Sequence, residues 1–158
     1  MRPGEVTIRA AGPADGAVIA TMIAEHGSEE GATIRGRAED YAAALAAGRI
    51  GCLLAERAQE PLGLAMFYDT LSSWSGRPGL FLEDLYVRAA ARRLGIAQRL
   101  LAEVACIAVA RGADRLDLVV RDVNRARGFY AGQGLRELAG WQVWRADPPE
   151  LARLAGER

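Results

Sequence analysis

The stretch FLEDLYVRAAARRLGIAQRLL, residues 81–101, decides the fold of this chain. Its first residues are mostly apolar, aromatic or β-branched, and they predict a buried strand from Phe81 to Val87. After an arginine-rich link, apolar residues recur at helical spacing from Ile96 onward, which predicts a helix that ends near Arg111. The stretch is therefore a strand–loop–helix unit.

The start of this helix is a candidate phosphate site. The first N–H groups of a helix have no partner within it and carry partial positive charge, so they attract anions. Gly95 and Ala97 lack bulk, which lets a pyrophosphate approach the backbone, and Arg92 and Arg93 add positive charge. An ordinary crossover with two solvated arginines would have the same spacing, because short glycine motifs recur by chance.

Two adjacent carboxylates, Glu83 and Asp84, interrupt the apolar strand. Burying them is costly, so we expect them to face a polar cavity. Because side chains alternate along a strand, only one of the two is expected to point at a ligand there. The sequence does not decide which.

Length and composition indicate one soluble domain, residues 1–158, with no net charge. A neutral chain disfavours a nucleic-acid partner that is recognised through a basic surface. The chain has no long apolar run and no signal-like start, so we expect no membrane partner and a cytoplasmic location. His26 is the only histidine and the two cysteines lie far apart, so no metal site is expected.

The rest of the chain predicts a mixed α/β (α+β) domain. Strands are expected at residues 5–10, 50–56, 62–68 and 115–120, and as a final pair at 135–138 and 141–145. Helices are expected from Pro13 to about Gly27, at 37–47, from Asn124 to about Gly132, and after Pro148.

Residues 28–31 are expected to form an acidic loop. In the loop 69–79, the Trp74 indole is expected either to cover the core or to contact a substrate. The strand at 115–120 follows a crossover helix and should run parallel to the strand at 81–87, within an otherwise mostly antiparallel sheet with flanking helices.

Several motifs resemble those of a known superfamily. The pattern Arg92-x-x-Gly95-x-Ala97 resembles the acetyl-CoA signature of the GNAT superfamily of N-acetyltransferases, with Arg93 where that family usually has glycine. The segment from Asn124 to Tyr130 resembles its second signature. Segments 63–68, 74–76 and 82–87 resemble the diamine (spermidine/spermine) N-acetyltransferase branch, and the similarity is strongest from residue 63 to residue 134.

The resemblance implies the GNAT fold, with a central parallel strand pair, and acetyl-CoA as the acyl donor. Its pantetheine would lie along the strand at 85–87 and its pyrophosphate on the backbone of residues 93–98. The coenzyme contacts that the resemblance implies are Leu85, Tyr86, Val87, Arg92, Arg93, Leu94, Gly95, Ile96, Ala97, Gln98, Asn124, Arg127 and Tyr130.

The resemblance also implies a mechanism, which is direct transfer to a primary amine in a ternary complex. Glu83 would remove a proton from the ammonium, because an alkylamine has a pKa of roughly 10 and arrives protonated. Tyr130 would return a proton to the departing thiolate. The implied acceptor contacts are Trp74, Glu83, Asp84, Glu29 and Glu30.

The implied acceptor is a polyamine-like, diamine or amino-acid-like small molecule. The alternatives are a protein N-terminus, an aminoglycoside-like amine, or a module that binds CoA without chemistry. The resemblance further implies a homodimer, with residues 141–145 and the tail as the candidate interface.

Overall fold

A computed structural model of the protein describes residues 5–156. These residues fall into two compact units, which meet in the sequence between Arg121 and Asp122. No helix in the described part of the chain is both long enough and apolar enough to cross a membrane.

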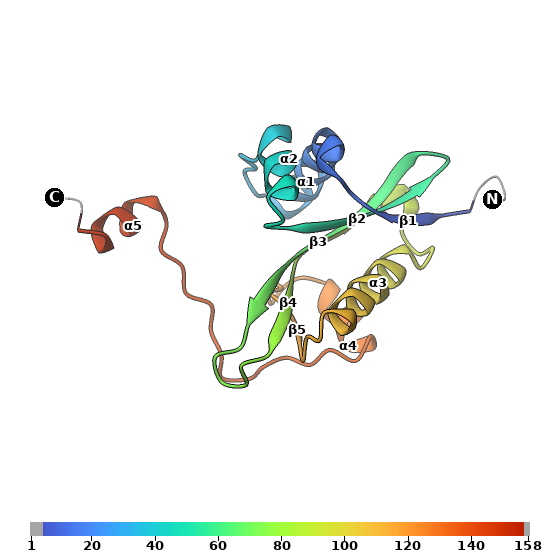
Figure 1. The fold of residues 1–158 in the computed structure, drawn as a ribbon. Helices are drawn as coiled ribbons and strands as arrows, with labels where there is room; N and C mark the ends of the chain where they lie inside the picture. Colours follow the sequence, from blue (N-terminus) through green and yellow to red (C-terminus); the bar gives the residue numbers. More distant parts are fainter. Residues whose placement is uncertain (1–4, 157–158) are drawn as a thin grey trace. The chain divides into compact units, whose positions relative to one another are not determined.

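The first unit contains a five-stranded sheet in the order β1-β2-β3-β4-β5 (Figure 1). The strands are β1 (Thr7–Ala10), β2 (Gly51–Arg57), β3 (Glu60–Leu71), β4 (Pro78–Val87) and β5 (Leu116–Leu118). The pairs β1/β2, β2/β3 and β3/β4 are antiparallel, and β5 runs parallel to β4. The predicted mixed sheet is confirmed, although β5 is shorter than expected.

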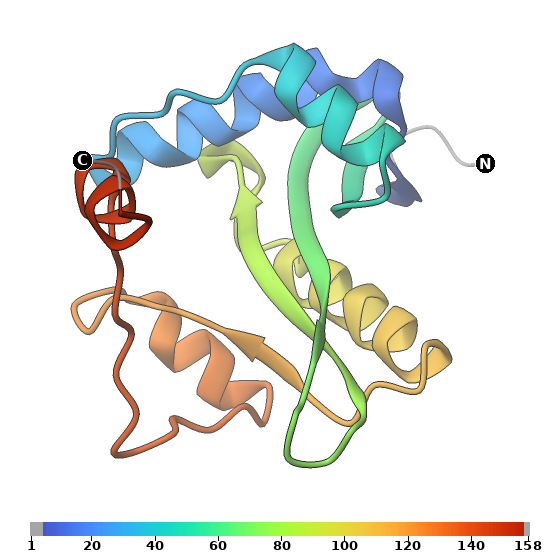
Figure 2. The same cartoon turned by 60° about the vertical axis from the view of Figure 1, so that its left-hand side comes forward.

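Helices cover both faces of this sheet. In Figures 1 and 2, α1 (Gly16–Glu30) and α2 (Ala38–Ala46) lie on one face, and α3 (Ile96–Ala110) lies on the other. Short 3₁₀ turns precede two of these helices: η1 (Pro13–Asp15) leads into α1, and η2 (Ala89–Ala91) follows β4. The helix predicted from residue 96 onward is confirmed.

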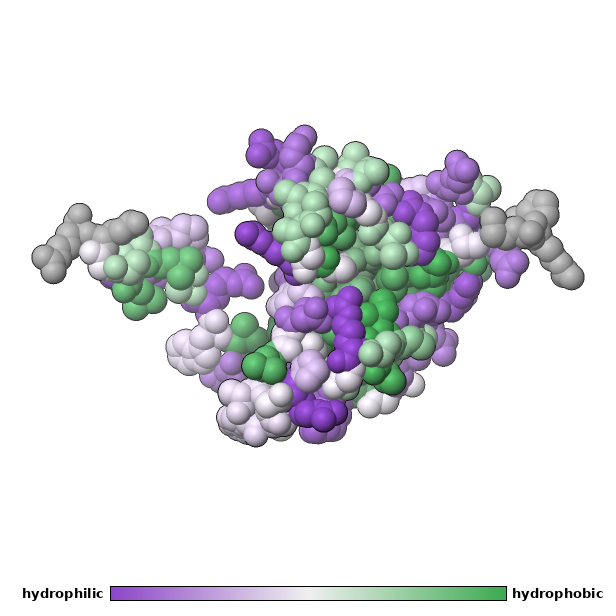
Figure 3. Space-filling model, in the orientation of Figure 1, coloured by the Kyte–Doolittle hydropathy of each residue, from purple (hydrophilic) through white to green (hydrophobic). Residues whose placement is uncertain are grey.

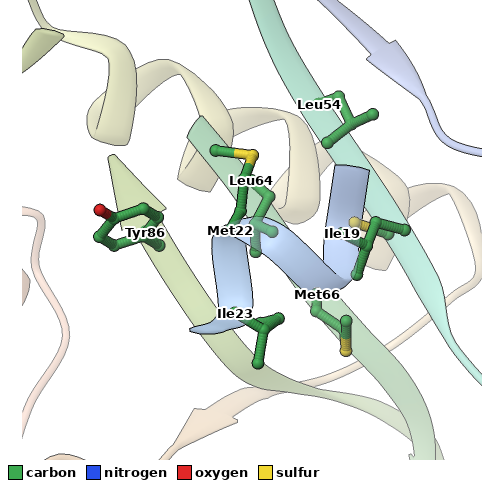
Figure 4. Packing of buried hydrophobic residues seen from close by; sticks show 8 residues of the cluster. Ile19, Met22, Ile23, Leu54, Leu64, Met66 and Tyr86 are labelled. Carbon is green, nitrogen blue, oxygen red and sulfur yellow. The ribbon is translucent and has the colours of Figure 1, made fainter. Parts of the chain in front are cut away.

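The core beneath α1 consists of apolar side chains from one helix and three strands (Figure 4). The cluster contains Ile19, Met22, Ile23, Cys52, Leu54, Leu64, Met66 and Tyr86. Fully burying one such side chain contributes roughly 1.5–3 kcal/mol. This packing fixes α1 over the middle of β3 and β4, so residues at the end of α1 lie near the end of β4.

The predicted acidic loop at residues 28–31 is wrong, because Ser28, Glu29 and Glu30 form the last turn of α1. The helix ends at Gly31, whose φ of 67° is a left-handed conformation that glycine adopts without strain. The extra turn matters because it carries both acidic residues on a rigid helix instead of a loop.

The second unit contains α4 (Ala126–Gly132) and α5 (Pro148–Leu154), both as predicted. The predicted strand pair at 135–138 and 141–145 is wrong, because neither segment pairs with a strand in the part of the chain that is described. A strand is stable only when a neighbour accepts and donates its backbone hydrogen bonds. Large apolar side chains are instead exposed here and in α5: Trp141, Val143, Trp144, Leu151 and Leu154. In Figure 3, hydrophobic green atoms of α5 lie on the surface among hydrophilic purple ones.

Candidate active site

A bulge in β4 opens one edge of that strand. The register with β3 shifts, so that Asp84 lies opposite Met66 and Leu82 lies opposite Phe67, which leaves Glu83 as an extra residue. The parallel pairing with β5 covers only the residues from Leu80 to Leu82. Among the described residues, the segment from Glu83 to Val87 therefore has no strand on its β5 side.

This open edge is a suitable binding site for an extended ligand. Backbone N–H and C=O groups along an unpaired strand edge can bind such a ligand as an added strand would. Three of the predicted coenzyme contacts, Leu85, Tyr86 and Val87, belong to this segment. The bulge was not visible in the sequence, because it arises from the register with β3.

The predicted phosphate site lies at the N-terminus of α3. Gly95 precedes this helix with a φ of 73°, and no side chain of the described residues caps the helix start. The first N–H groups are therefore available to an anion. Arg93 also has a positive φ, 64°, so the backbone here keeps a conformation that favours glycine although the residue is arginine.

The remaining predicted contacts of this turn differ in exposure. Leu94 is half exposed, whereas Ile96 is buried in the core below α3. Ile96 can therefore contribute its backbone N–H to a ligand but not its side chain. Ala97 and Gln98 belong to the first turn of α3.

Arg92 connects three elements. Its Nε donates to the carbonyl of Val87 at 2.8 Å, and its Nη2 forms an ion pair with Glu29 of α1. Its guanidinium lies 5.9 Å from the centre of the Tyr86 ring. One predicted coenzyme contact and one predicted acceptor contact are thus bound to each other.

Burial affects the ionisation of Asp84. Burial raises the pKa of its carboxyl, while the nearby His26 lowers it, with Nε2 of His26 3.7 Å from Oδ1 of Asp84. His26 belongs to α1, so Asp84 faces that helix. The charge of Asp84 also adds to the burial that raises the pKa of Tyr41 in α2.

The expectation that strand alternation separates Glu83 from Asp84 is wrong. Tyr68, two residues after Met66 on β3, has its pKa raised by burial and by the charge of Glu83. In the register between β3 and β4, Tyr68 pairs with Phe81 and Met66 pairs with Asp84. Phe81 and Asp84 therefore lie on the face of the core under α1 although they are three residues apart. Glu83, two residues after Phe81, lies on that face as well. The bulge interrupts the alternation, and two carboxylates gather on one side of β4.

Each of three acidic residues near the end of α1 forms an ion pair with an arginine. The pairs are Glu25 with Arg88, Glu29 with Arg92, and Glu30 with Arg121. Glu25 and Arg88 were not among the site residues expected from the sequence. Their spacing was a usable signal, because Glu25 and Glu29 lie four residues apart on a helix, as Arg88 and Arg92 do in the chain.

Trp74 lies in the turn between β3 and β4, and its side chain is 86% exposed. The interpretation that its indole covers the core is therefore wrong. The turn is ordered by hydrogen bonds, since the hydroxyl of Ser75 donates to Asp114 at 2.9 Å and the N–H of Gly76 donates to the carbonyl of Ser72 at 2.7 Å. A substrate contact of Trp74 stays a prediction.

In the second unit, Asn124 lies one residue before the N-cap of α4, which is Arg125, and not at the expected cap position itself. Its Oδ1 accepts a hydrogen bond from the N–H of Ala126 at 2.8 Å. Arg127 forms an ion pair with Glu137 at 2.7 Å. Tyr130 lies near the end of α4, where its ring meets that of Phe129 edge to face at 5.3 Å.

Comparison with known proteins identifies the class. Residues 19–135 match the model of the Acetyltransferase (GNAT) family, which is most of the chain. The chain therefore belongs to the GNAT family of acetyl-CoA-dependent N-acetyltransferases.

Named relatives refine this assignment. The chain is 34% identical over 118 residues to the thialysine N-ε-acetyltransferase of Bos taurus, which covers 67% of this chain and 69% of that protein. It is also 34% identical over 117 residues to the human spermidine/spermine N(1)-acetyltransferase-like protein 1, covering 67% of this chain and 17% of that protein.

Among solved structures, an aminoglycoside acetyltransferase from an uncultured soil metagenomic sample matches with a TM-score of 0.77 at 16% identity. The match covers 90% of this chain and 97% of the other. At this identity the match supports the fold alone. The predicted resemblance to the diamine branch of the family is confirmed by the first two relatives.

Proposed function

We propose that this enzyme transfers the acetyl group of acetyl-CoA to a primary amine of a small cationic molecule, such as a diamine or an amino acid with an amine-bearing side chain. The observation that carries the proposal is the pair of carboxylates, Glu83 and Asp84, gathered at the bulge beside the open edge of β4. A carboxylate attracts an ammonium and can also accept its proton. Relatives named for thialysine and for spermidine or spermine support this acceptor class.

In this proposal, the pantetheine of acetyl-CoA lies along the backbone from Leu85 to Val87. The open edge there supports this placement, since it offers backbone donors and acceptors to an extended ligand. The pyrophosphate lies on the backbone of residues 93–98, where the uncapped start of α3 and its dipole favour an anion. Asn124 and Arg127 are proposed as further coenzyme contacts.

The proposed chemistry begins with the acceptor amine. Glu83 removes a proton from the ammonium, directly or through a water, and Asp84 holds the cation by charge. The neutral amine then attacks the thioester carbonyl, and a backbone N–H of β4 binds the oxyanion that develops. Tyr130 protonates the sulfur as the C–S bond breaks, and the proton that the new amide nitrogen loses restores the phenol through water. Because the amine itself attacks the thioester, no acyl-enzyme forms. Trp74 and Glu30 are proposed as further acceptor contacts.

We also propose a cytoplasmic homodimer that uses residues 141–145 and the tail. The large exposed side chains of Val143, Trp144 and Leu154 support it, since exposed apolar patches mark interaction sites. Light scattering of the wild type and of Trp144→Asp tests it, with a loss of dimer expected in the variant. A monomeric wild type would contradict it.

Thiol release from acetyl-CoA in the presence of a panel of amines tests the function. The panel should contain a diamine, ornithine or another diamino acid, an aminoglycoside and a peptide with a free N-terminus. Fast release with one of the first two is expected. Release only with the peptide or the aminoglycoside would move the enzyme to those acceptors, and acetyl-CoA binding without release for any amine would leave a non-catalytic module.

Tyr130→Phe is the matched variant in this assay, because it removes one hydroxyl. A fall in kcat of about 10²–10⁴-fold is expected with acetyl-CoA affinity nearly unchanged. Unchanged turnover would remove Tyr130 from the mechanism.

A further inference from the structure

Two glutamates of α1 and two arginines after β4 form a ladder of ion pairs around one phenol. Arg88 donates to both carboxylate oxygens of Glu25, at 2.9 and 2.8 Å. One turn further along α1, Arg92 pairs with Glu29. The hydroxyl of Tyr86 lies between the pairs, 3.2 Å from Oε1 of Glu29 and 3.4 Å from Oε2 of Glu25.

The ladder joins α1 to both ends of the turn η2. Arg88 stands immediately before this turn and Arg92 immediately after it. Each arginine also donates to a strand, since Arg88 Nη1 reaches the carbonyl of Pro61 at 2.8 Å and Arg92 Nε reaches the carbonyl of Val87 at 2.8 Å. The chain that leaves β4 is thus fixed to the sheet and to α1 at two points four residues apart.

Arg93, the residue immediately after Arg92, adopts an unfavourable backbone conformation. Arg93 has a φ of 64°, a left-handed conformation that costs an ordinary residue roughly 1–2 kcal/mol. Such a conformation persists only where the surroundings hold it. The ion pair of Glu29 with Arg92 is the side-chain contact immediately beside it, so it is well placed to hold the turn from Arg92 to Gly95.

The carboxylate of Glu29 is already occupied in this arrangement. Its Oε2 accepts from Arg92 and its Oε1 accepts from Tyr86. The hydrogen bond from Arg92 is the main cause that lowers the pKa of Glu29, so the group stays ionised and its charge is matched by an arginine. Glu29 therefore presents little uncompensated charge to an ammonium, in contrast to Asp84.

We infer that Glu29 is a positioning residue for acetyl-CoA: by holding Arg92, it fixes the turn whose backbone N–H groups receive the pyrophosphate. The inference rests on the proposed coenzyme site and replaces the acceptor contact that the sequence suggested for Glu29. The carboxylate acts through Arg92 and touches neither the coenzyme nor the amine. Its loss should weaken coenzyme binding and leave the acceptor unaffected.

The test is Glu29→Gln, with Glu103→Gln on the exposed face of α3 as the matched control. Calorimetry with acetyl-CoA and steady-state kinetics against both substrates give the readouts, after circular dichroism has checked the fold. We expect Glu29→Gln to raise the Kd and KM for acetyl-CoA about 3–10-fold, while the amine KM stays within twofold. The control should change neither.

A double-mutant cycle with Arg92→Gln identifies the route. If Glu29 acts through Arg92, adding Glu29→Gln to Arg92→Gln changes the Kd for acetyl-CoA by less than twofold. Additive effects would overturn the inference. So would a raised amine KM with an unchanged acetyl-CoA Kd, or no change in either.

The failure of this inference is distinguishable from the failure of the proposed function. Calorimetry measures coenzyme binding without turnover, so it tests Glu29 even if no amine in the panel is acetylated. If the wild type binds acetyl-CoA and Glu29→Gln binds it with equal affinity, only the role of Glu29 is overturned. A wild type that does not bind acetyl-CoA overturns both.

Discussion

The two halves of β4 have different neighbours and different side chains. Up to Leu82, β4 pairs with β3 on one side and with β5 on the other, and Leu80 and Leu82 are at most 2% exposed. From Glu83 to Val87, the described residues pair it with β3 alone. One strand thus supplies packing in its first half and an open, acidic edge in its second, and the change occurs at a single inserted residue, Glu83.

This difference shows how a stable sheet can carry a binding site. Closing the second half with another strand would satisfy the backbone groups, but it would leave no edge for a ligand. The bulge turns the edge away from β5 and breaks the alternation of side chains, so that two carboxylates lie on the face of α1. Substitutions in the first half should therefore change stability, and substitutions in the second should change activity.

Glu83→Gln should have the largest effect, because it removes the proposed base from the open half. We expect a fall in kcat of about 10²–10⁴-fold at neutral pH. The remaining activity should rise with pH toward the pKa of the amine, roughly 10, since more acceptor is then neutral. The pH dependence of kcat/KM measures this, and a profile with the shape of the wild type would count against Glu83 as base.

Leu80→Ala tests the paired half. Leu80 is fully buried, so removing its methyl groups should lower the free energy of unfolding by about 2–5 kcal/mol. The kcat of the folded fraction should stay within about threefold, because Leu80 precedes the bulge. Urea unfolding and active-enzyme titration measure the two quantities, and a large loss of kcat in fully folded protein would erase the distinction between the halves.

Asp84→Asn should change the free energy of unfolding less than Leu80→Ala does, and it should raise this free energy where Leu80→Ala lowers it. Burial raises the pKa of Asp84, so between its unfolded and folded pKa values the native protein binds more protons than the unfolded chain. Stability therefore falls as the pH rises through this window, and the ionised group remains a cost at neutral pH. The variant lacks this cost and should gain roughly 1 kcal/mol at pH 7, with lower activity.

Urea unfolding of Asp84→Asn at several pH values checks the sign. The advantage of the variant should disappear as the pH falls below about 3.9, where the wild-type carboxyl is protonated in both states. The exposed change Asp122→Asn is the control and should stay within about 0.5 kcal/mol of the wild type. An Asp84→Asn protein that is less stable than the wild type at pH 7 would show that the carboxylate stabilises the fold.

The features predicted correctly from the sequence are those set by neighbouring residues. The apolar pattern from Phe81 to Leu101 specified a strand, and Gly95 marked the start of the following helix. The bulge at Glu83 was missed because register depends on β3, whose paired residues Met66 and Phe67 lie well before the bulge in the chain. The last turn of α1 was missed because its glutamates read as loop residues.

Long-range contacts account for most of the remaining differences. The partner of Glu29 is Arg92, 63 residues away, and no local pattern reveals such a pair. The segment 141–145 is rich in aromatic and β-branched residues, which favour a strand, but composition alone does not provide a neighbouring strand. The chemical types of the candidate site residues could be read from the sequence. Which of them form ion pairs with one another depended on the tertiary fold.

Arg93→Gly should have the smallest effect on stability, and it separates the backbone from the charge at the open end of β4. Glycine relieves the left-handed strain of about 1–2 kcal/mol but gives the unfolded chain more freedom, which costs about 0.5–1 kcal/mol. We therefore expect a net gain of roughly 0.5 kcal/mol in urea unfolding. Arg93→Ala is the matched variant, because it removes the same charge and keeps the strain, so it should show no gain.

If the side chain contributes charge to the pyrophosphate site, both variants should raise the Kd for acetyl-CoA equally, by about threefold. A loss confined to the glycine variant would instead mean that rigidity of the turn, rather than the guanidinium, supports the coenzyme, since only glycine loosens the backbone.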